Sequence, residues 1–106
     1  MNRVDGKVAV VTGGTQGLGK AIAMNLAKMG AKGIVTLGRN EKRGEEVANS
    51  INQETSCETY FFKTELSDVN NCREGIAFTL EKFSQIDILV NAAGLTDRGN
   101  IVETSE

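Results

Sequence analysis

Apolar and polar positions follow two different periods along the chain, and together they predict four strands separated by three helices. Four short runs are rich in β-branched or aromatic residues and are bounded by turn residues, as strands are. They cover residues 7–12, 33–38, 59–64 and 86–91. The first and the fourth are almost wholly apolar, which is typical of strands that are covered on both faces of a sheet.

Between these runs, apolar residues recur at spacings of three and four, as they do on the buried face of a helix. The first stripe consists of Leu18, Ile22, Leu26 and Met29, and the last consists of Val69, Cys72, Ile76, Leu80 and Phe83. The middle stretch, about residues 41–53, has a weaker stripe of Val47, Ala48 and Ile51. Gly30 is expected to end the first helix.

This alternation of strands and helices predicts an α/β fold. A strand, a helix and a second strand in succession form a parallel pair with a right-handed crossover. The expected arrangement is a doubly wound parallel sheet with helices on both faces and the partial strand order 3-2-1-4. In such sheets, ligands bind beyond the carboxyl ends of the strands, where the strand order reverses. Here that point lies between the first and the fourth strand.

A glycine-rich segment, VTGGTQGLG at residues 11–19, lies at that place. It joins the first strand to the first helix, whose unpaired N–H groups and positive dipole end favour a phosphate. Gly13 is expected to form the tight turn, Gly17 to let the backbone approach a pyrophosphate, and Gly19 to let helix and strand pack closely. A simple turn remains the alternative interpretation of the segment by itself.

Composition narrows the class of protein. The chain has 106 residues, 40% of them apolar and 25% charged, with a net charge of -2. This is typical of one soluble globular domain, and it lacks the basic excess that nucleic-acid or anionic-membrane binding needs. No apolar run of about 18 residues and no signal-peptide core are found, so no membrane partner is expected and the predicted location is cytoplasmic.

Histidine is absent and cysteine is scarce, which excludes several kinds of site. Without histidine there is no Ser-His-Asp or Cys-His catalysis, and two cysteines leave no zinc spacing, so no metal is expected. Cys57 and Cys72 are predicted to be free thiols. Placed at opposite ends of one strand, they would lie about 20 Å apart, beyond the reach of a disulfide.

Three motifs occur together in this chain. They are Thr12-Gly13-x-x-x-Gly17-x-Gly19, Asn91-Ala92-Ala93-Gly94 and Asp5-Gly6-Lys7. In combination they resemble the short-chain dehydrogenase/reductase family. The resemblance implies a Rossmann-like dinucleotide-binding domain over residues 1–106, corresponding to the N-terminal part of the family's longer domain. It also implies an oxidoreductase that moves a hydride between a nicotinamide cofactor and a carbonyl/alcohol pair.

The family's cofactor contacts can be transferred where the motifs match. Thr15 and Leu18 become backbone donors beside the pyrophosphate, and Glu65-Leu66 takes the place of the pair that holds the adenine, with Glu65 one methylene longer than the usual Asp. Ala92 replaces the second Asn of the family's N-N-A-G. The cofactor residues expected from this resemblance are Gly13, Thr15, Gln16, Gly17, Leu18, Gly19, Arg39, Asn40, Glu65, Leu66, Asn91, Ala93 and Gly94.

Cofactor choice is predicted at the end of the second strand. NAD-binding sheets carry an acidic residue there, which accepts hydrogen bonds from the ribose 2′-hydroxyl, whereas this chain has Gly38 followed by Arg39. The Arg39 guanidinium is expected to bind the 2′-phosphate of NADP, with Asn40 as a second donor, so NADP is predicted over NAD. Gln16 is neutral where many NADP-binding relatives hold Arg or Lys, and Arg39 as an ordinary surface residue is the alternative.

No catalytic residue is assigned within this chain. The family's Ser, Tyr and Lys lie downstream of N-A-A-G, and the single tyrosine, Tyr60, falls inside a strand, where a structural role is expected. The chain is therefore interpreted as the cofactor-binding part of a longer enzyme with a small-molecule substrate, inactive by itself. A stand-alone dinucleotide-binding module or sensor, and a scaffold subunit, are the alternatives. An uncovered fourth strand at the sheet edge predicts a homo-oligomer.

Overall fold

The computed structural model describes residues 4–13, 17–65 and 69–92. Within these ranges strands and helices alternate as the sequence predicts. The elements are β1 (Val8–Thr12), α1 (Gly17–Lys28), β2 (Gly33–Gly38), α2 (Glu41–Glu54), β3 (Glu58–Lys63), α3 (Val69–Phe83) and β4 (Ile88–Asn91). The strand boundaries differ from the predicted ones by no more than two residues.

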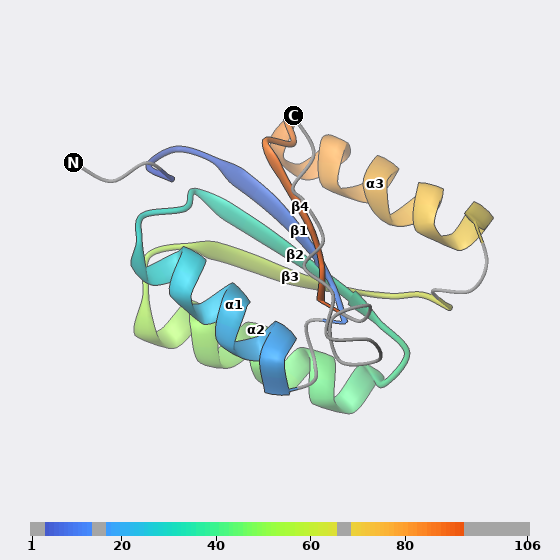
Figure 1. The fold of residues 1–106 in the computed structure, drawn as a ribbon, viewed down its shortest axis with the longest axis horizontal. Helices are drawn as coiled ribbons and strands as arrows, with labels where there is room; N and C mark the ends of the chain where they lie inside the picture. The colour runs from blue at the N-terminus through green and yellow to red at the C-terminus, as the bar shows by residue number, and fades with distance from the viewer. Residues whose placement is uncertain (1–3, 14–16, 66–68, 93–106) are drawn as a thin grey trace.

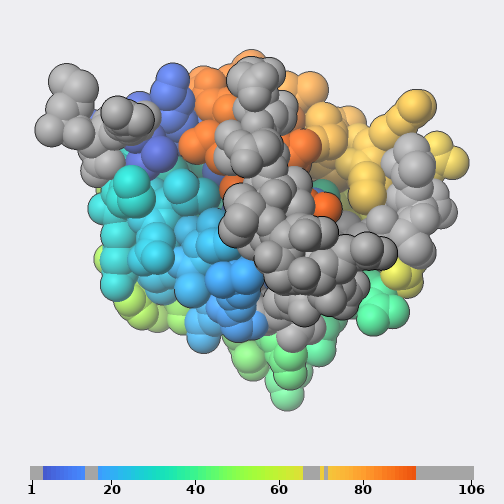
Figure 2. Space-filling view, in the orientation of Figure 1, coloured from blue at the N-terminus to red at the C-terminus, as the bar shows by residue number. Residues whose placement is uncertain are grey.

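The four strands form one parallel sheet in the order β3-β2-β1-β4. Helices α1 and α2 cover one face of this sheet and α3 lies on the other (Figure 1). In the space-filling view, α1 and α2 lie below and α3 lies above, so helical layers form much of the outer surface (Figure 2). The predicted α/β architecture and strand order are confirmed, and all four carboxyl ends meet at one edge.

The core has two layers because successive side chains of a strand point to opposite faces. Ala9, Val11 and Ile34 pack in the layer beneath α1 and α2. Val8, Val10, Val35 and Leu37 pack in the layer beneath α3. Strands β1 and β2 are therefore buried on both faces, and this explains their almost continuous apolar sequence.

The buried face of α1 differs from the predicted one. Leu18 and Met29 are 42% and 43% exposed, whereas Gly19, Ala23 and Ala27 are buried. A helix face made of glycine and alanine allows close packing on the sheet, and the longer Ile22 and Leu26 then pack beside the contact. The prediction was wrong at both ends of the stripe because it weighted large apolar residues over small ones.

The buried face of α3 also differs from the apolar stripe. Leu80 is exposed, whereas the neighbouring Thr79 is fully buried. Thr79 can be buried because its Oγ1 donates a hydrogen bond to the backbone oxygen of Gly75, 2.9 Å away. Phe83 is buried as predicted. A count of apolar residues alone misses a threonine whose hydroxyl is satisfied within its own helix.

The other helical predictions are confirmed. Val47, Ala48 and Ile51 form the buried side of α2, together with Gly44. Gly30 follows α1 with a φ of +103°, the left-handed conformation that commonly ends helices. Its N–H donates to the Ala27 carbonyl, and the next N–H, from Ala31, donates to the Leu26 carbonyl. These two bonds form the Schellman arrangement.

Both cysteines are free thiols, but their predicted placement on one strand was wrong. Cys57 lies directly before β3, whereas Cys72 lies on α3, since the strand ends at Lys63. Burial raises the pKa of the Cys57 thiol above its ordinary value. This effect outweighs that of the hydrogen bond with Thr59, which lowers the pKa.

None of the helices in the described part of the chain combines the length and the apolar character needed to cross a bilayer. Among the same residues, no three His, Cys, Asp or Glu side chains gather into a set that could hold a metal ion.

Candidate functional site

The chain turns sharply as it leaves β1. Gly13 has a φ of +73°, a conformation that residues with a Cβ rarely adopt, and its N–H donates to the Leu37 carbonyl across the sheet edge, 2.8 Å away. The backbone at the end of β1 is thereby tied to the end of β2. This geometry agrees with the tight turn expected of Gly13.

Helix α1 begins at the carboxyl edge of the sheet, and its first residue, Gly17, is exposed. A Cβ built on Gly17 meets no atom of the described residues within 4 Å. The first turn carries no acidic side chain that would neutralise the helix dipole. The first N–H groups of a helix have no partner within it, so this end can bind an anion. Gly19, two residues on, is buried instead.

The ends of β1 and β4 are joined where the strand order reverses. Thr12 and Asn91 are partners in the parallel register, and the Thr12 hydroxyl donates to Asn91 Oδ1 at 3.0 Å. The next residue, Ala92, is buried in the core beside α1. Alanine suits this buried position, because it places no polar group in the core, whereas an asparagine there would have to bury its amide.

At the ends of β2 and β3, charged side chains surround a hollow of about 310 Å³. Arg39, Lys63, Thr64 and Glu65 line it. Arg39 Nε lies 3.8 Å from Glu65 Oε1, and these side chains are 76% and 49% exposed. The Thr64 side chain differs from these, since its Oγ1 is buried and has no hydrogen-bond partner among the residues described here.

Asn40 has a structural role that the sequence reasoning missed. It caps the N-terminus of α2, where its Oδ1 accepts a hydrogen bond from the Arg43 N–H at 2.9 Å. The sequence does indicate this helix cap, because asparagine is among the preferred residues directly before a helix. The cap uses the side-chain oxygen, so the predicted donation to a phosphate would have to come from the Nδ2 atom.

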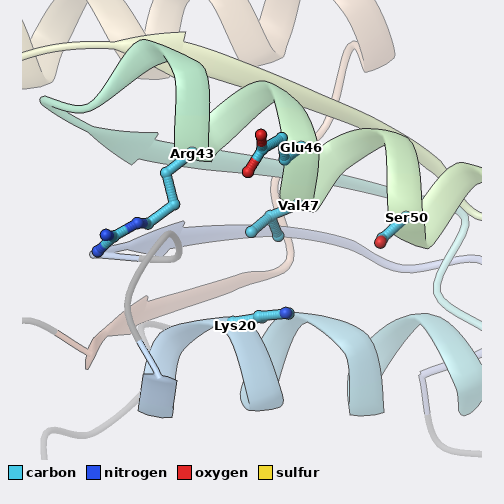
Figure 3. Close-up of a pocket in the computed structure, with 5 residues that line it drawn as sticks. All are labelled: Lys20, Arg43, Glu46, Val47 and Ser50. Atoms are coloured by element: carbon cyan, nitrogen blue, oxygen red, sulfur yellow. The ribbon is translucent and has the colours of Figure 1, made fainter.

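A second hollow, of about 340 Å³, lies on the outer surface between α1 and α2. Lys20, Arg43, Glu46, Val47 and Ser50 line it. Figure 3 shows Arg43 extending away from the other four side chains. The charged members are exposed, as the outer face of a surface helix requires. None of the predicted cofactor residues that the structure describes lines this groove.

Tyr60 has the structural role that was expected. Its ring packs against Phe78 and Phe83 of α3, with centroids 5.8 and 5.9 Å apart. Its hydroxyl hydrogen-bonds the Glu58 carboxylate, which raises the pKa of Tyr60. The side chain faces α3 from partway along β3 and not from the carboxyl end of that strand, so it holds no position suited to proton transfer at the candidate site.

Of the predicted cofactor residues, the structure brings a subset to one edge of the sheet. These are Gly13, Gly17, Leu18, Gly19, Arg39, Asn40, Glu65 and Asn91. Five others lie outside the described residues, namely Thr15, Gln16, Leu66, Ala93 and Gly94. Glu65 contacts Arg39, a pairing that the sequence reasoning did not anticipate.

Comparisons with known proteins agree with this geometry. The family model described as short chain dehydrogenase matches residues 7–106. A 3beta-hydroxysteroid dehydrogenase of Mediterraneibacter gnavus is 37% identical over the whole chain, which spans 38% of that enzyme's length.

Two solved structures are also similar. The L-sorbose reductase of Gluconobacter frateurii, complexed with NADPH and L-sorbose, is 32% identical with a TM-score of 0.78, over 82% of this chain and 33% of the reductase. A 3-ketoacyl-(acyl-carrier-protein) reductase of Brucella melitensis, complexed with NADH, is 32% identical with a TM-score of 0.74, over 82% of this chain and 34% of its own. Because the family model matches nearly every residue and the fold agrees, this chain belongs to the short-chain dehydrogenase family of oxidoreductases.

Proposed function

We propose that this chain is the cofactor-binding part of an NADP(H)-dependent enzyme that interconverts a carbonyl compound and an alcohol. The observation that carries the proposal is the N-terminus of α1. None of the described residues has an atom within 4 Å of a Cβ placed on Gly17, and this helix end lies at the same sheet edge as the Gly13 turn and the Thr12–Asn91 contact. A pyrophosphate fits the chemistry of this place, because the first N–H groups of a helix have no partner within it and Gly17 adds no side chain.

The site residues named above have binding or positioning roles in this proposal. The first N–H groups of α1 bind the pyrophosphate, and Gly13 turns the chain so that the helix starts over the sheet edge. The contact between Thr12 and Asn91 fixes the end of β1 relative to the end of β4. The nicotinamide, when bound, accepts or donates the hydride. Tyr60 serves packing, so the proton donor is expected in the family's downstream Tyr-x-x-x-Lys.

The names of the relatives support the reaction class without deciding the substrate. One is a hydroxysteroid dehydrogenase and two are reductases of a sugar and of a ketoacyl group. All three names imply a carbonyl/alcohol pair. Between them, the two solved relatives hold NADPH and NADH, so cofactor choice must be argued from this chain.

Arg39 supports NADP. It follows the buried Gly38 at the end of β2, where an acidic side chain would repel a 2′-phosphate. A charge-assisted hydrogen bond contributes about 1.5 to 3 kcal/mol, which predicts roughly 10- to 150-fold tighter binding of NADP than of NAD.

Calorimetric titration of the full-length protein with both cofactors tests the proposal. NADP is expected to bind more tightly, and the double variant Gly38→Asp with Arg39→Ala is expected to remove or reverse the preference. Equal affinities, or tighter binding of NAD, would show that Arg39 does not bind the phosphate. Binding of both cofactors without turnover of any carbonyl compound would instead favour a dinucleotide-binding module or sensor.

A further inference from the structure

We propose that Glu65 tunes cofactor choice by acting as an internal counter-anion for Arg39, so that it weakens the binding of NADP without weakening that of NAD. This inference rests on the proposed function, since it concerns the residue expected to bind the 2′-phosphate. The sequence assigned Glu65 a different contact, with the adenine.

The parallel register brings the two side chains together. Gly38 is the partner of Lys63, and the Thr64 N–H continues the ladder by donating to the Gly38 carbonyl at 2.7 Å. The residues that follow these strands therefore leave the sheet side by side. Arg39 and Glu65 meet there, with 3.8 Å between Nε and Oε1. Glutamate has one methylene more than the aspartate usual in the family, which gives its carboxylate a longer reach.

The hollow around this ion pair is suited to an anion. Two cations, Arg39 and Lys63, and one carboxylate, Glu65, line it, so its local charge is +1 at neutral pH. Thr64 adds a hydroxyl that is buried, with the residue only 5% exposed, and that lacks a partner among the described residues. A buried hydroxyl without a partner is unfavourable unless a ligand or water satisfies it. Within the described residues, Lys63 and a buried hydroxyl without a partner thus lie beside Arg39, and this combination suits an anionic group.

Glu65 opposes a phosphate at this site in two ways. Its carboxylate already forms an ion pair with the Arg39 guanidinium, so a 2′-phosphate that binds Arg39 has to share or replace that contact. It also repels the phosphate, because both are negatively charged and the hollow brings them within a few ångströms. The neutral 2′-hydroxyl of NAD meets neither penalty. Removing the charge of Glu65 should thus strengthen NADP binding selectively.

Isothermal titration of the full-length protein with NADP and with NAD tests this role by affinity alone. Exposed ion pairs are worth up to about 1 kcal/mol, so Glu65→Gln is expected to tighten NADP binding roughly two- to fivefold while NAD affinity stays unchanged. The gain should shrink at high salt, since both side chains are solvent-exposed. In an Arg39→Gln background, Glu65→Gln should have a smaller effect, because the ion pair is already absent.

Glu54→Gln is the matched control. It makes the same change at the C-terminal end of α2, away from the carboxyl edge of the sheet, and should leave both affinities unaltered. If both cofactors bind but Glu65→Gln leaves their ratio unchanged, the role of Glu65 is refuted and the proposed function stands. If Glu65→Gln weakens NADP and NAD equally, Glu65 contacts a part common to both, such as the adenine, and the inference also fails. If neither cofactor binds to the protein or to any variant, the inference and the proposed function fail together.

Discussion

Replacing Gly17 by alanine separates what the fold needs from what a ligand needs. The new methyl group would meet no atom of the described residues within 4 Å, and Gly17 is helical, so its backbone suits alanine. Under such conditions Gly→Ala raises the free energy of unfolding by about 0.4 to 1 kcal/mol. The variant is therefore expected to be as stable as the parent protein or slightly more stable.

The same methyl group should interfere with a cofactor. If the pyrophosphate lies against the N-terminus of α1, a side chain on Gly17 enters the space that the ligand occupies. Forcing a methyl group into a packed contact typically costs about 1 to 3 kcal/mol. This corresponds to a loss of NADP affinity of roughly 5- to 150-fold.

Gly44→Ala is the contrasting control. Gly44 is also helical, but a Cβ there would lie 2.2 Å from Cδ1 of Phe61, so α2 could no longer pack as closely on β3. Overpacking of about 1 to 3 kcal/mol should outweigh the gain of about 1 kcal/mol in helix propensity, and the variant should lose stability.

Urea denaturation measures the two stabilities and calorimetric titration measures the affinity for NADP. Unchanged NADP affinity in Gly17→Ala would refute the placement of the pyrophosphate at this helix end. A loss of more than about 1 kcal/mol in its stability would show that the glycine is needed by the fold itself.

Three other predictions concern acid stability, thiol reactivity and assembly. The pKa of Asp87 is lowered mainly by the hydrogen bond from the Val8 N–H, so its contribution to stability is present above about pH 4 and is lost as the pH falls through the lowered pKa. Asp87→Asn should make urea denaturation less sensitive to pH below pH 4, and an unaltered pH profile would contradict this. In a Cys72→Ser variant, the buried Cys57 should react with Ellman's reagent only after unfolding, because burial raises the pKa of its thiol; rapid reaction of the native protein would count against it. Within the described sheet β4 pairs only with β1, and an edge strand can pair with another chain, so sedimentation of the 106-residue chain should show self-association; a clean monomer would contradict this expectation.

Local sequence patterns were enough to predict the strands, their order and two of the turns between them. Short apolar runs gave all four strands, and α2 was found from only Val47, Ala48 and Ile51. The left-handed Gly13 and Gly30 were placed correctly as well. These features depend on residues close in the chain: side-chain periodicity and the freedom of glycine act over one turn or one strand. The parallel sheet then follows, because helical crossovers between successive strands leave few other topologies.

Which side chains contact one another depends instead on how the elements pack in the complete fold. The close approach of α1 to the sheet buried Gly19, Ala23 and Ala27 and left Leu18 exposed, since the separation of two layers selects the side chains that fit between them. The contact of Arg39 with Glu65 joins residues that follow different strands, and it depends on the β2–β3 register. No local pattern encodes that register, because it results from packing both strands against the same helices. Electrostatic contacts at the candidate site are therefore fixed by the fold and not by spacing along the chain.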